Sequence, residues 1–155
     1  MLIIDQRFNG GGNYHKTADC MTDFGRSIPQ DGHLYVVVAG PTFSAGIVSA
    51  AIAVVAATNH VTLIGSPVGD RLISWGEDNL LKLPNSGIEI KFSTGKHDLV
   101  NGCDNWRQCY WGSMNSDLRI ESLVPHVMVP LTFDDYRNGR DPVMEVIRAR
   151  EENAR

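Results

Sequence analysis

Two short segments of this sequence pair an apolar strand with the residue types of an acyl-transfer site. The first runs from Leu2 to Asp5 and leads into Gly10, Gly11 and Gly12. The second runs from Leu34 to Ala39 and turns through Gly40-Pro41 toward Ser44. Glycines let backbone N–H groups approach a ligand closely, and a serine at a helix N-terminus lies in positive dipole potential. Together these segments offer a nucleophile and donors for an oxyanion.

Both segments also have purely structural interpretations. Ser44 is of the type that caps a helix by accepting hydrogen bonds from its first backbone amides. The run from Gly10 to Gly12 is compatible with a tight turn and nothing more. On the residues alone, the structural and the catalytic interpretations both stay open.

The bulk composition is that of an ordinary globular domain. The chain has 155 residues, 43% of them apolar and 21% charged, which predicts a single domain over residues 1–155. A net charge of −4 gives no electrostatic reason to expect a nucleic acid partner. The weakly polar stretch from Ala45 to Ala57 is too short to span a membrane, and Met1 leads into a strand without the features of a signal peptide. No cofactor is expected.

Three cysteines do not make a disulfide scaffold. Cys20 lies in a predicted helix and is expected to be a small core residue. Cys103 and Cys109 bracket a polar loop, where a disulfide would form in an oxidising compartment and two free thiols would persist elsewhere. No metal site is expected, because two further ligands at zinc-site spacing are absent.

The first half of the sequence alternates between strands and helices. Apolar runs predict strands, and periodic or small apolar stretches predict helices. The strands are expected at 2–5, 34–39 and 61–64, and the helices at 15–26 and 43–58. Strand–helix–strand spacing of this kind predicts an α/β fold with a mostly parallel sheet, strand 2–5 beside strand 34–39 and helix 43–58 packed against the sheet.

The second half of the sequence has a different pattern of apolar and turn residues. Short apolar runs separated by Gly76–Asn79 and Pro84–Gly87 predict an antiparallel meander, followed by loops over 95–118. The three strands of this meander are expected at 72–75, 80–83 and 88–93. A last strand is expected at 127–131, a helical turn at 132–135, and a helix capped by Asp141 to about Arg150.

Five segments, in order, resemble landmarks of the tail-specific (C-terminal-processing) and tricorn-like serine peptidases. Asp5-Gln6-Arg7-Phe8-Asn9-Gly10-Gly11-Gly12 resembles the family's Asp-x-Arg-x-Asn-x-Gly-Gly turn, and Thr42-Phe43-Ser44-Ala45 its Thr-x-Ser-Ala nucleophile segment. Gly65–Arg71 stands where the family has a glycine turn that carries a lysine. Residues 83–87, and 124–126 with 139–142, resemble later landmarks. The resemblance covers nearly the whole sequence.

The resemblance implies a crotonase-like fold and hydrolysis of peptide or protein substrates. Ser44 matches the nucleophile, and the amides of Ala45 and of Gly11 or Gly12 match the oxyanion hole. The resemblance also implies a periplasmic or secreted location. Because the family domain begins before the strand at Met1, the chain resembles the C-terminal part of a catalytic domain. An exposed sheet surface is then expected to leave it marginally stable, associated into a homo-oligomer, or dependent on a missing N-terminal half.

The general base is where this sequence departs from the family. Arg71 stands at the position of the processing proteases' lysine, and a guanidinium stays protonated and cannot accept the serine proton. Arg71 is therefore expected to bind a substrate carboxylate or to form a salt bridge. Tricorn-like members use an upstream histidine assisted by a downstream glutamate, a role that Glu77 matches. Glu77 as a solvated turn residue is the other possibility.

The five histidines of the sequence are expected to be surface or capping residues, with His15 the nearest to a catalytic position because it follows the glycine turn. Without a base, a second function class stays open. The protein would then be a non-catalytic binding module, or an inactive fragment that keeps a peptidase-like cleft.

Overall fold

The computed structural model describes residues 1–114 and 116–153. The chain divides into two compact units. The first comprises Met1–Asp70 and Leu123–Arg155, and the second comprises Arg71–Ser122. Each unit is described by itself.

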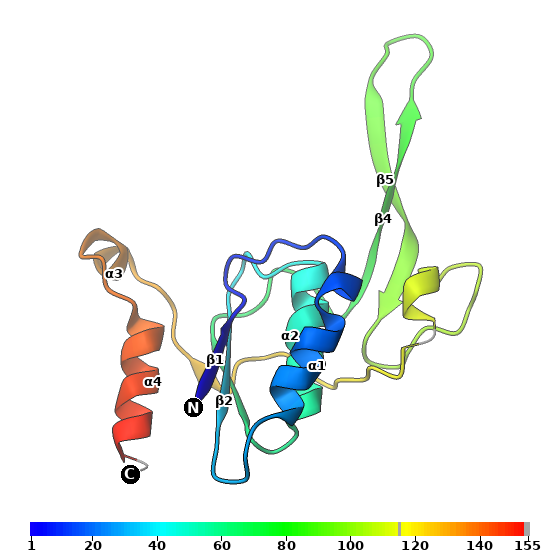
Figure 1. Cartoon of the computed structure of the whole chain (residues 1–155). Coiled ribbons are helices and arrows are strands. Elements are labelled where there is room, and N and C mark those ends of the chain that lie inside the picture. The colour runs from blue at the N-terminus through cyan, green and yellow to red at the C-terminus, as the bar shows by residue number, and fades with distance from the viewer. Residues whose placement is uncertain (115, 154–155) are drawn as a thin grey trace. The chain divides into compact units, whose positions relative to one another are not determined.

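A four-stranded parallel sheet organises the first unit (Figure 1). Its strands, in spatial order, are β1 (Leu2–Asp5), β2 (Leu34–Val38), β3 (Val61–Gly65) and β6 (Val127–Met128). Leu2 pairs with Leu34, and Leu34 pairs with Val61. The predicted parallel sheet, with strand 2–5 beside strand 34–39, is confirmed. The last strand is shorter than the expected 127–131.

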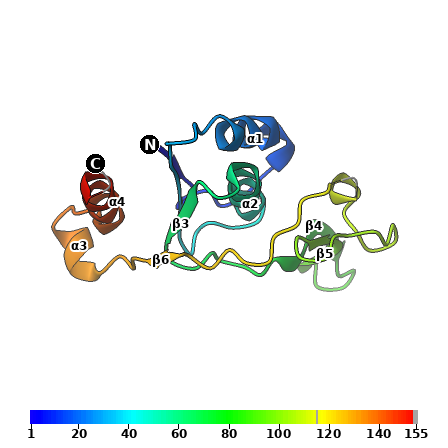
Figure 2. The same ribbon diagram turned by 90° about the horizontal axis from the view of Figure 1, so that it is seen from below.

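Helices cover both faces of this sheet (Figure 2). On one side lie α1 (Ala18–Arg26) and α2 (Ala45–Ala57), and on the other lies α4 (Pro142–Asn153). Every residue of β2 is buried, as a central parallel strand between two helical layers requires. Tyr35, Val37 and Ile64 pack with Val143 and Ile147 of α4 in one core cluster.

The helix α2 is apolar on nearly every side and is buried along most of its length, as predicted. Its small residues let α1 approach closely, since a Cβ added at Gly25 would lie 2.6 Å from the Cβ of Ala56. This contact turns the opposite side of α1 to solvent. Cys20 is exposed there, so the prediction that it belongs to the core is wrong.

Two short helices and one helix cap complete the first unit. The expected helix 15–26 is split into η1 (Tyr14–Lys16) and α1. The expected turn at 132–135 is α3 (Phe133–Arg137), which begins with a capping box between Thr132 and Asp135. Asp141 caps α4 by accepting the N–H of Met144 at 3.2 Å, and the helix continues past the expected end to Asn153.

The second unit contains one long hairpin rather than a three-stranded meander. Strand β4 (Ile73–Lys82) pairs antiparallel with β5 (Glu89–Asp98), in one register from Ile73↔Asp98 to Lys82↔Glu89. The expected turn at Gly76–Asn79 is wrong, because pairing on both sides of Glu77 carries the strand through these residues. Pro84–Gly87 does form the turn between β4 and β5.

The rest of the second unit is irregular and holds η2 (Trp111–Ser113). A disulfide joins Cys103 and Cys109, whose Cα atoms lie 5.7 Å apart. The disulfide closes the tryptophan-containing loop, one of the two outcomes that the sequence left open. Asn115 and residues 154–155 are outside the described residues.

Candidate active site

The two glycine-flanked segments meet at one edge of the sheet. Because β1 and β2 are parallel neighbours, the loop after Asp5 and the turn after Val38 leave the sheet at the same, carboxyl end. This edge is where α/β folds commonly place their functional loops. The backbone N–H of Phe43 donates to the carbonyl oxygen of Asn9 at 3.0 Å, which joins the two segments directly.

Ser44 occupies the junction between this turn and α2 in a rarely populated backbone conformation. Its φ is 51° and its ψ is −122°, and only two other non-glycine residues among those described have positive φ. Ser44 is exposed, and its hydroxyl makes no capping hydrogen bond. The interpretation of Ser44 as a helix-capping hydroxyl is therefore wrong. A serine on a strained strand-to-helix turn, with its hydroxyl free of a capping bond, resembles the serine of a nucleophile elbow.

The glycine loop lies directly against Ser44. A Cβ built on Gly11 would lie 2.8 Å from the Cβ of Ser44 and 3.3 Å from its Oγ, so only glycine fits there. Gly11 and Gly12 have φ values of 118° and 122°, a region that residues other than glycine rarely tolerate. The loop is therefore more than a tight turn, because its backbone is packed beside the candidate nucleophile.

The backbone N–H groups around Ser44 differ in whether another group of the protein accepts a hydrogen bond from them. The N–H of Gly11 donates to Oδ1 of Asn9 at 3.2 Å. Among residues 1–114 and 116–153, no acceptor takes the N–H of Gly12 or of Ala45. Of the two glycines that the sequence offered as oxyanion donors, Gly12 is the one whose amide is open to a ligand.

Thr42 anchors the turn that leads from β2 to Ser44. The residue is completely buried, and its Oγ1 accepts the N–H of Ala39 at 3.0 Å and donates to the carbonyl oxygen of Gln6 at 2.8 Å. Its own carbonyl oxygen accepts the N–H of Gly69 at 2.9 Å. Thr42 thus ties three loops of the first unit together two residues before Ser44.

Arg7, another residue of the same sequence motif, has a structural role. Its guanidinium bridges Asp5 and Asp141, with both shortest N–O distances at 2.7 Å. Hydrogen bonds to these carboxylates raise the pKa of Arg7, and the hydrogen bond from Arg7 lowers the pKa of Asp141. This ion-pair group connects the carboxyl end of β1 to the start of α4.

The other two predicted site residues belong to the second unit. Arg71 precedes β4, and Glu77 lies within β4 at a φ of 58°. The carboxylate of Glu77 is half exposed, and its Oε1 lies 3.5 Å from Nε2 of His97. Glu77 is therefore a strand residue with a histidine partner and not a turn residue. The proposed roles of Arg71 and Glu77 in catalysis stay predictions.

The His97–Glu77 pair was missed in the sequence, where His97 was expected to be a surface or capping residue. The His97 side chain is 16% exposed and packs near the ring of Tyr110. Burial lowers the pKa of His97, and the charge of Glu77 opposes part of that shift. The hairpin register pairs His97 with Ser74, so the contact with Glu77 comes from the direction of the two side chains, which the sequence does not show.

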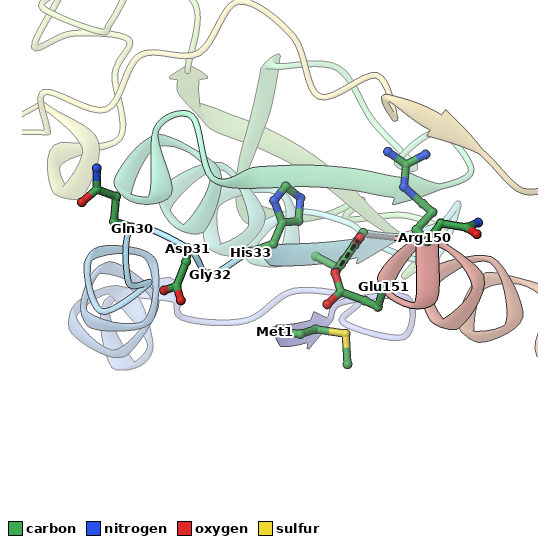
Figure 3. A pocket seen from close by; sticks show the side chains of 9 residues that line it. Met1, Gln30, Asp31, Gly32, His33, Arg150 and Glu151 are labelled. Carbon is green, nitrogen blue, oxygen red and sulfur yellow. Dashed lines mark hydrogen bonds between the residues drawn. The ribbon is translucent and has the colours of Figure 1, made fainter. Parts of the chain in front are cut away.

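A separate pocket of about 630 Å³ lies at the other end of β2 (Figure 3). Tyr35 donates a hydrogen bond to Glu151 there, at 3.1 Å, and His33 lies close by. None of the predicted site residues lines it. The lining residues are Met1, Gln30, Asp31, Gly32, His33, Tyr35, Arg150, Glu151 and Asn153.

Metal-binding clusters and membrane-spanning helices are both absent from the described residues. No group of three or more His, Cys, Asp or Glu side chains among them is arranged to hold a metal ion. None of the helices they form has the length and apolar character needed to cross a membrane.

Comparison with known proteins places the fold but not a family. No family model and no curated protein matches the sequence. The structure is similar to the crystal structure of a "putative peptidase" from Parabacteroides merdae ATCC 43184, with a TM-score of 0.57 at 18% sequence identity. The similarity covers 95% of this chain and 50% of that protein, so this chain spans about half of that protein's length. The chain has a peptidase-like α/β fold.

Proposed function

We propose that this protein provides the nucleophile and the oxyanion site of a serine-type peptidase, of the tail-specific kind and with a crotonase-like fold. The observation that carries the proposal is the backbone of Ser44, an exposed residue at a φ of 51° whose hydroxyl makes no capping hydrogen bond. Such a conformation costs about 1–3 kcal/mol in a non-glycine residue. Glycine adopts this conformation without that cost, so a serine held there directly beside the glycine loop supports a function for Ser44.

In the proposed reaction, Oγ of Ser44 attacks the carbonyl carbon of a peptide bond while its proton passes to a base. The carbonyl oxygen becomes an oxyanion, which the N–H groups of Gly12 and Ala45 stabilise. The C–N bond then breaks, the amine leaves with a proton from the base, and an ester on Ser44 remains. Water hydrolyses that ester and restores the hydroxyl.

The proposed roles of the second unit's residues follow from their chemistry. By resemblance to the tricorn-like peptidases, Glu77 is proposed to orient the histidine that acts as the base. Arg71 is proposed to hold a carboxylate of the substrate through its guanidinium. The C-terminus of a peptide or protein substrate would provide that carboxylate.

A fluorophosphonate probe tests the proposal, because it labels serines whose hydroxyl is activated and whose oxyanion donors are in place. In the full-length protein we expect labelling at Ser44 and its loss in Ser44→Ala. Ser27→Ala is the matched control, since Ser27 is also an exposed serine at a helix end but has an ordinary φ of −80°. Equal labelling of the Ser44→Ala and wild-type proteins would overturn the proposal, and an unlabelled wild type would favour the binding-module alternative.

A further inference from the structure

Asn9 makes four hydrogen bonds at the point where β1 becomes the glycine loop, one of them from its own N–H to the carbonyl oxygen of Gln6 at 3.0 Å. Its carbonyl oxygen accepts the N–H of Phe43 at 3.0 Å. Its side-chain Oδ1 accepts the N–H of Gly11 at 3.2 Å, and its Nδ2 donates to Oε1 of Gln6 at 2.6 Å. One residue therefore contacts the strand end, the glycine loop and the nucleophile turn.

The anchor of this arrangement is buried. Gln6 is 6% exposed, its N–H donates to Val37 of β2 at 2.8 Å, and its carbonyl oxygen accepts the hydroxyl of Thr42. A continuous series of hydrogen bonds thus runs from the sheet, through Gln6 and Asn9, to Gly11. The Gln6 end of this series is buried, so breaking the bond between Gln6 and Asn9 leaves a buried polar group unpaired, which favours one geometry for Asn9.

The start of α2 is shaped to admit Asn9. A Cβ built on Gly46 would collide with the carbonyl oxygen of Asn9, so a glycine in the first turn of the helix is needed for this contact. The requirement is independent of the hydrogen bonds. An asparagine that only formed a local turn would need the bond to Gly11 but not the bond to Gln6.

We infer that Asn9 is a positioning residue, which locks the glycine loop onto the Ser44 turn and makes Gly12, rather than Gly11, the open oxyanion donor. The inference rests on the proposed function of Ser44. By occupying the Gly11 amide, the Asn9 side chain fixes the Gly10–Gly11 peptide plane, one residue before the amide of Gly12. Asn9 touches neither substrate nor the reacting atoms and acts through the backbone of the loop.

The test compares Asn9→Ala with wild type in the full-length protein, using saturation kinetics of a fluorophosphonate at Ser44. We expect the maximal labelling rate to fall about 10- to 100-fold, because a misplaced oxyanion donor weakens stabilisation of the reacting phosphoryl oxygen. The probe concentration at half-saturation should change less than about twofold, since binding contacts are untouched. Asn9→Ser should recover part of the rate, because a serine hydroxyl can accept the same amide two residues on.

Asn13→Ala is the matched control. Asn13 lies in the same loop, and its Oδ1 accepts the N–H of His15 at 3.0 Å in the same kind of turn, but among the described residues no hydrogen bond joins it to the Ser44 segment. Its labelling should equal that of wild type. If Ser44 of the wild type is labelled but Asn9→Ala is labelled at the same rate, the inference is overturned and the proposed function stands. The same holds if Asn13→Ala loses as much of the labelling rate as Asn9→Ala. A Ser44 that is not labelled in the wild type would overturn both.

Discussion

At the scale of single residues, the candidate site depends on backbone conformations that few residue types adopt. Ser44 and Glu77 both have positive φ, at 51° and 58°, and both are residues that the sequence singled out for chemistry. Strain of this kind concentrates at functional sites, where the surrounding structure maintains it. Gly11 supplies the complementary feature, because its missing side chain leaves room for Ser44.

Replacing Gly11 should therefore damage both the site and the stability of the protein. The added methyl of Gly11→Ala would lie 2.8 Å from the Cβ of Ser44 at a φ of 118°, so we expect a loss of about 1–3 kcal/mol in the free energy of unfolding. Labelling of Ser44 should be lost as well. Chemical denaturation and probe labelling measure the two effects.

Gly10→Ala is the control for that substitution, because no atom lies within 4 Å of its added Cβ. We expect near wild-type stability and labelling. If Gly10→Ala were as damaging as Gly11→Ala, the effect would belong to loop flexibility and not to contact with Ser44.

At the scale of elements, strand pairing within each unit brings its candidate residues together. Parallel pairing of β1 and β2 brings the glycine loop to the Ser44 turn, while antiparallel pairing of β4 and β5 brings Glu77 to His97. A Cβ on Gly95 would lie 2.7 Å from Cγ of Glu77, so Glu77 extends across the hairpin over a glycine.

The hairpin makes a direct prediction for the Glu77–His97 pair. The negative charge of Glu77 favours the protonated imidazole, so Glu77→Gln should lower the pKa of His97 further below its usual value. NMR titration of the ring protons would measure the shift. Asp78→Asn is the control, because the Asp78 side chain bonds to Ser93. A His97 pKa that is unchanged in Glu77→Gln would show that the two side chains do not interact in solution.

At the scale of the whole molecule, both units contain a histidine whose charge is disfavoured by burial. The pKa values of His33 in the first unit and His97 in the second are lowered, chiefly by desolvation. The ring of His33 forms a hydrogen bond with Thr62 at 2.8 Å. The charged or titratable groups near it include Glu151, Arg150 and His60. Three carboxylates, Asp98, Asp135 and Asp141, also have lowered pKa values.

These shifts predict how stability depends on pH. An unfolded histidine titrates near pH 6.5, so below that pH the unfolded protein binds more protons than the folded one, and acid favours unfolding. We expect the free energy of unfolding to fall between about pH 7.5 and 5.5, and to fall again below about pH 4 as the paired carboxylates become protonated. Denaturant titrations across this range would measure both steps. His97→Gln should reduce the first step, and a protein more stable at the acid end of that range would contradict the prediction.

The sequence by itself determined the parallel sheet, the buried helix after Ser44 and the two glycine-flanked segments. Apolar runs and small-residue stretches are local signals that tertiary packing here reinforces. Asp141 and Pro142 likewise marked the start of α4. The sequence also supplied Ser44 and Gly11 as candidates, through residue types that suit acyl transfer and through the resemblance to serine peptidases.

Only the tertiary structure decided how those residues are used. The positive φ of Ser44, the occupied amide of Gly11 and the hydrogen bonds of Asn9 all depend on neighbours from another strand or loop. The Gly76–Asn79 segment has the local composition of a turn, but pairing with β5 extends it through the strand and brings Glu77 to His97. Local propensity is worth a fraction of a kilocalorie per residue, and a ladder of cross-strand bonds outweighs it.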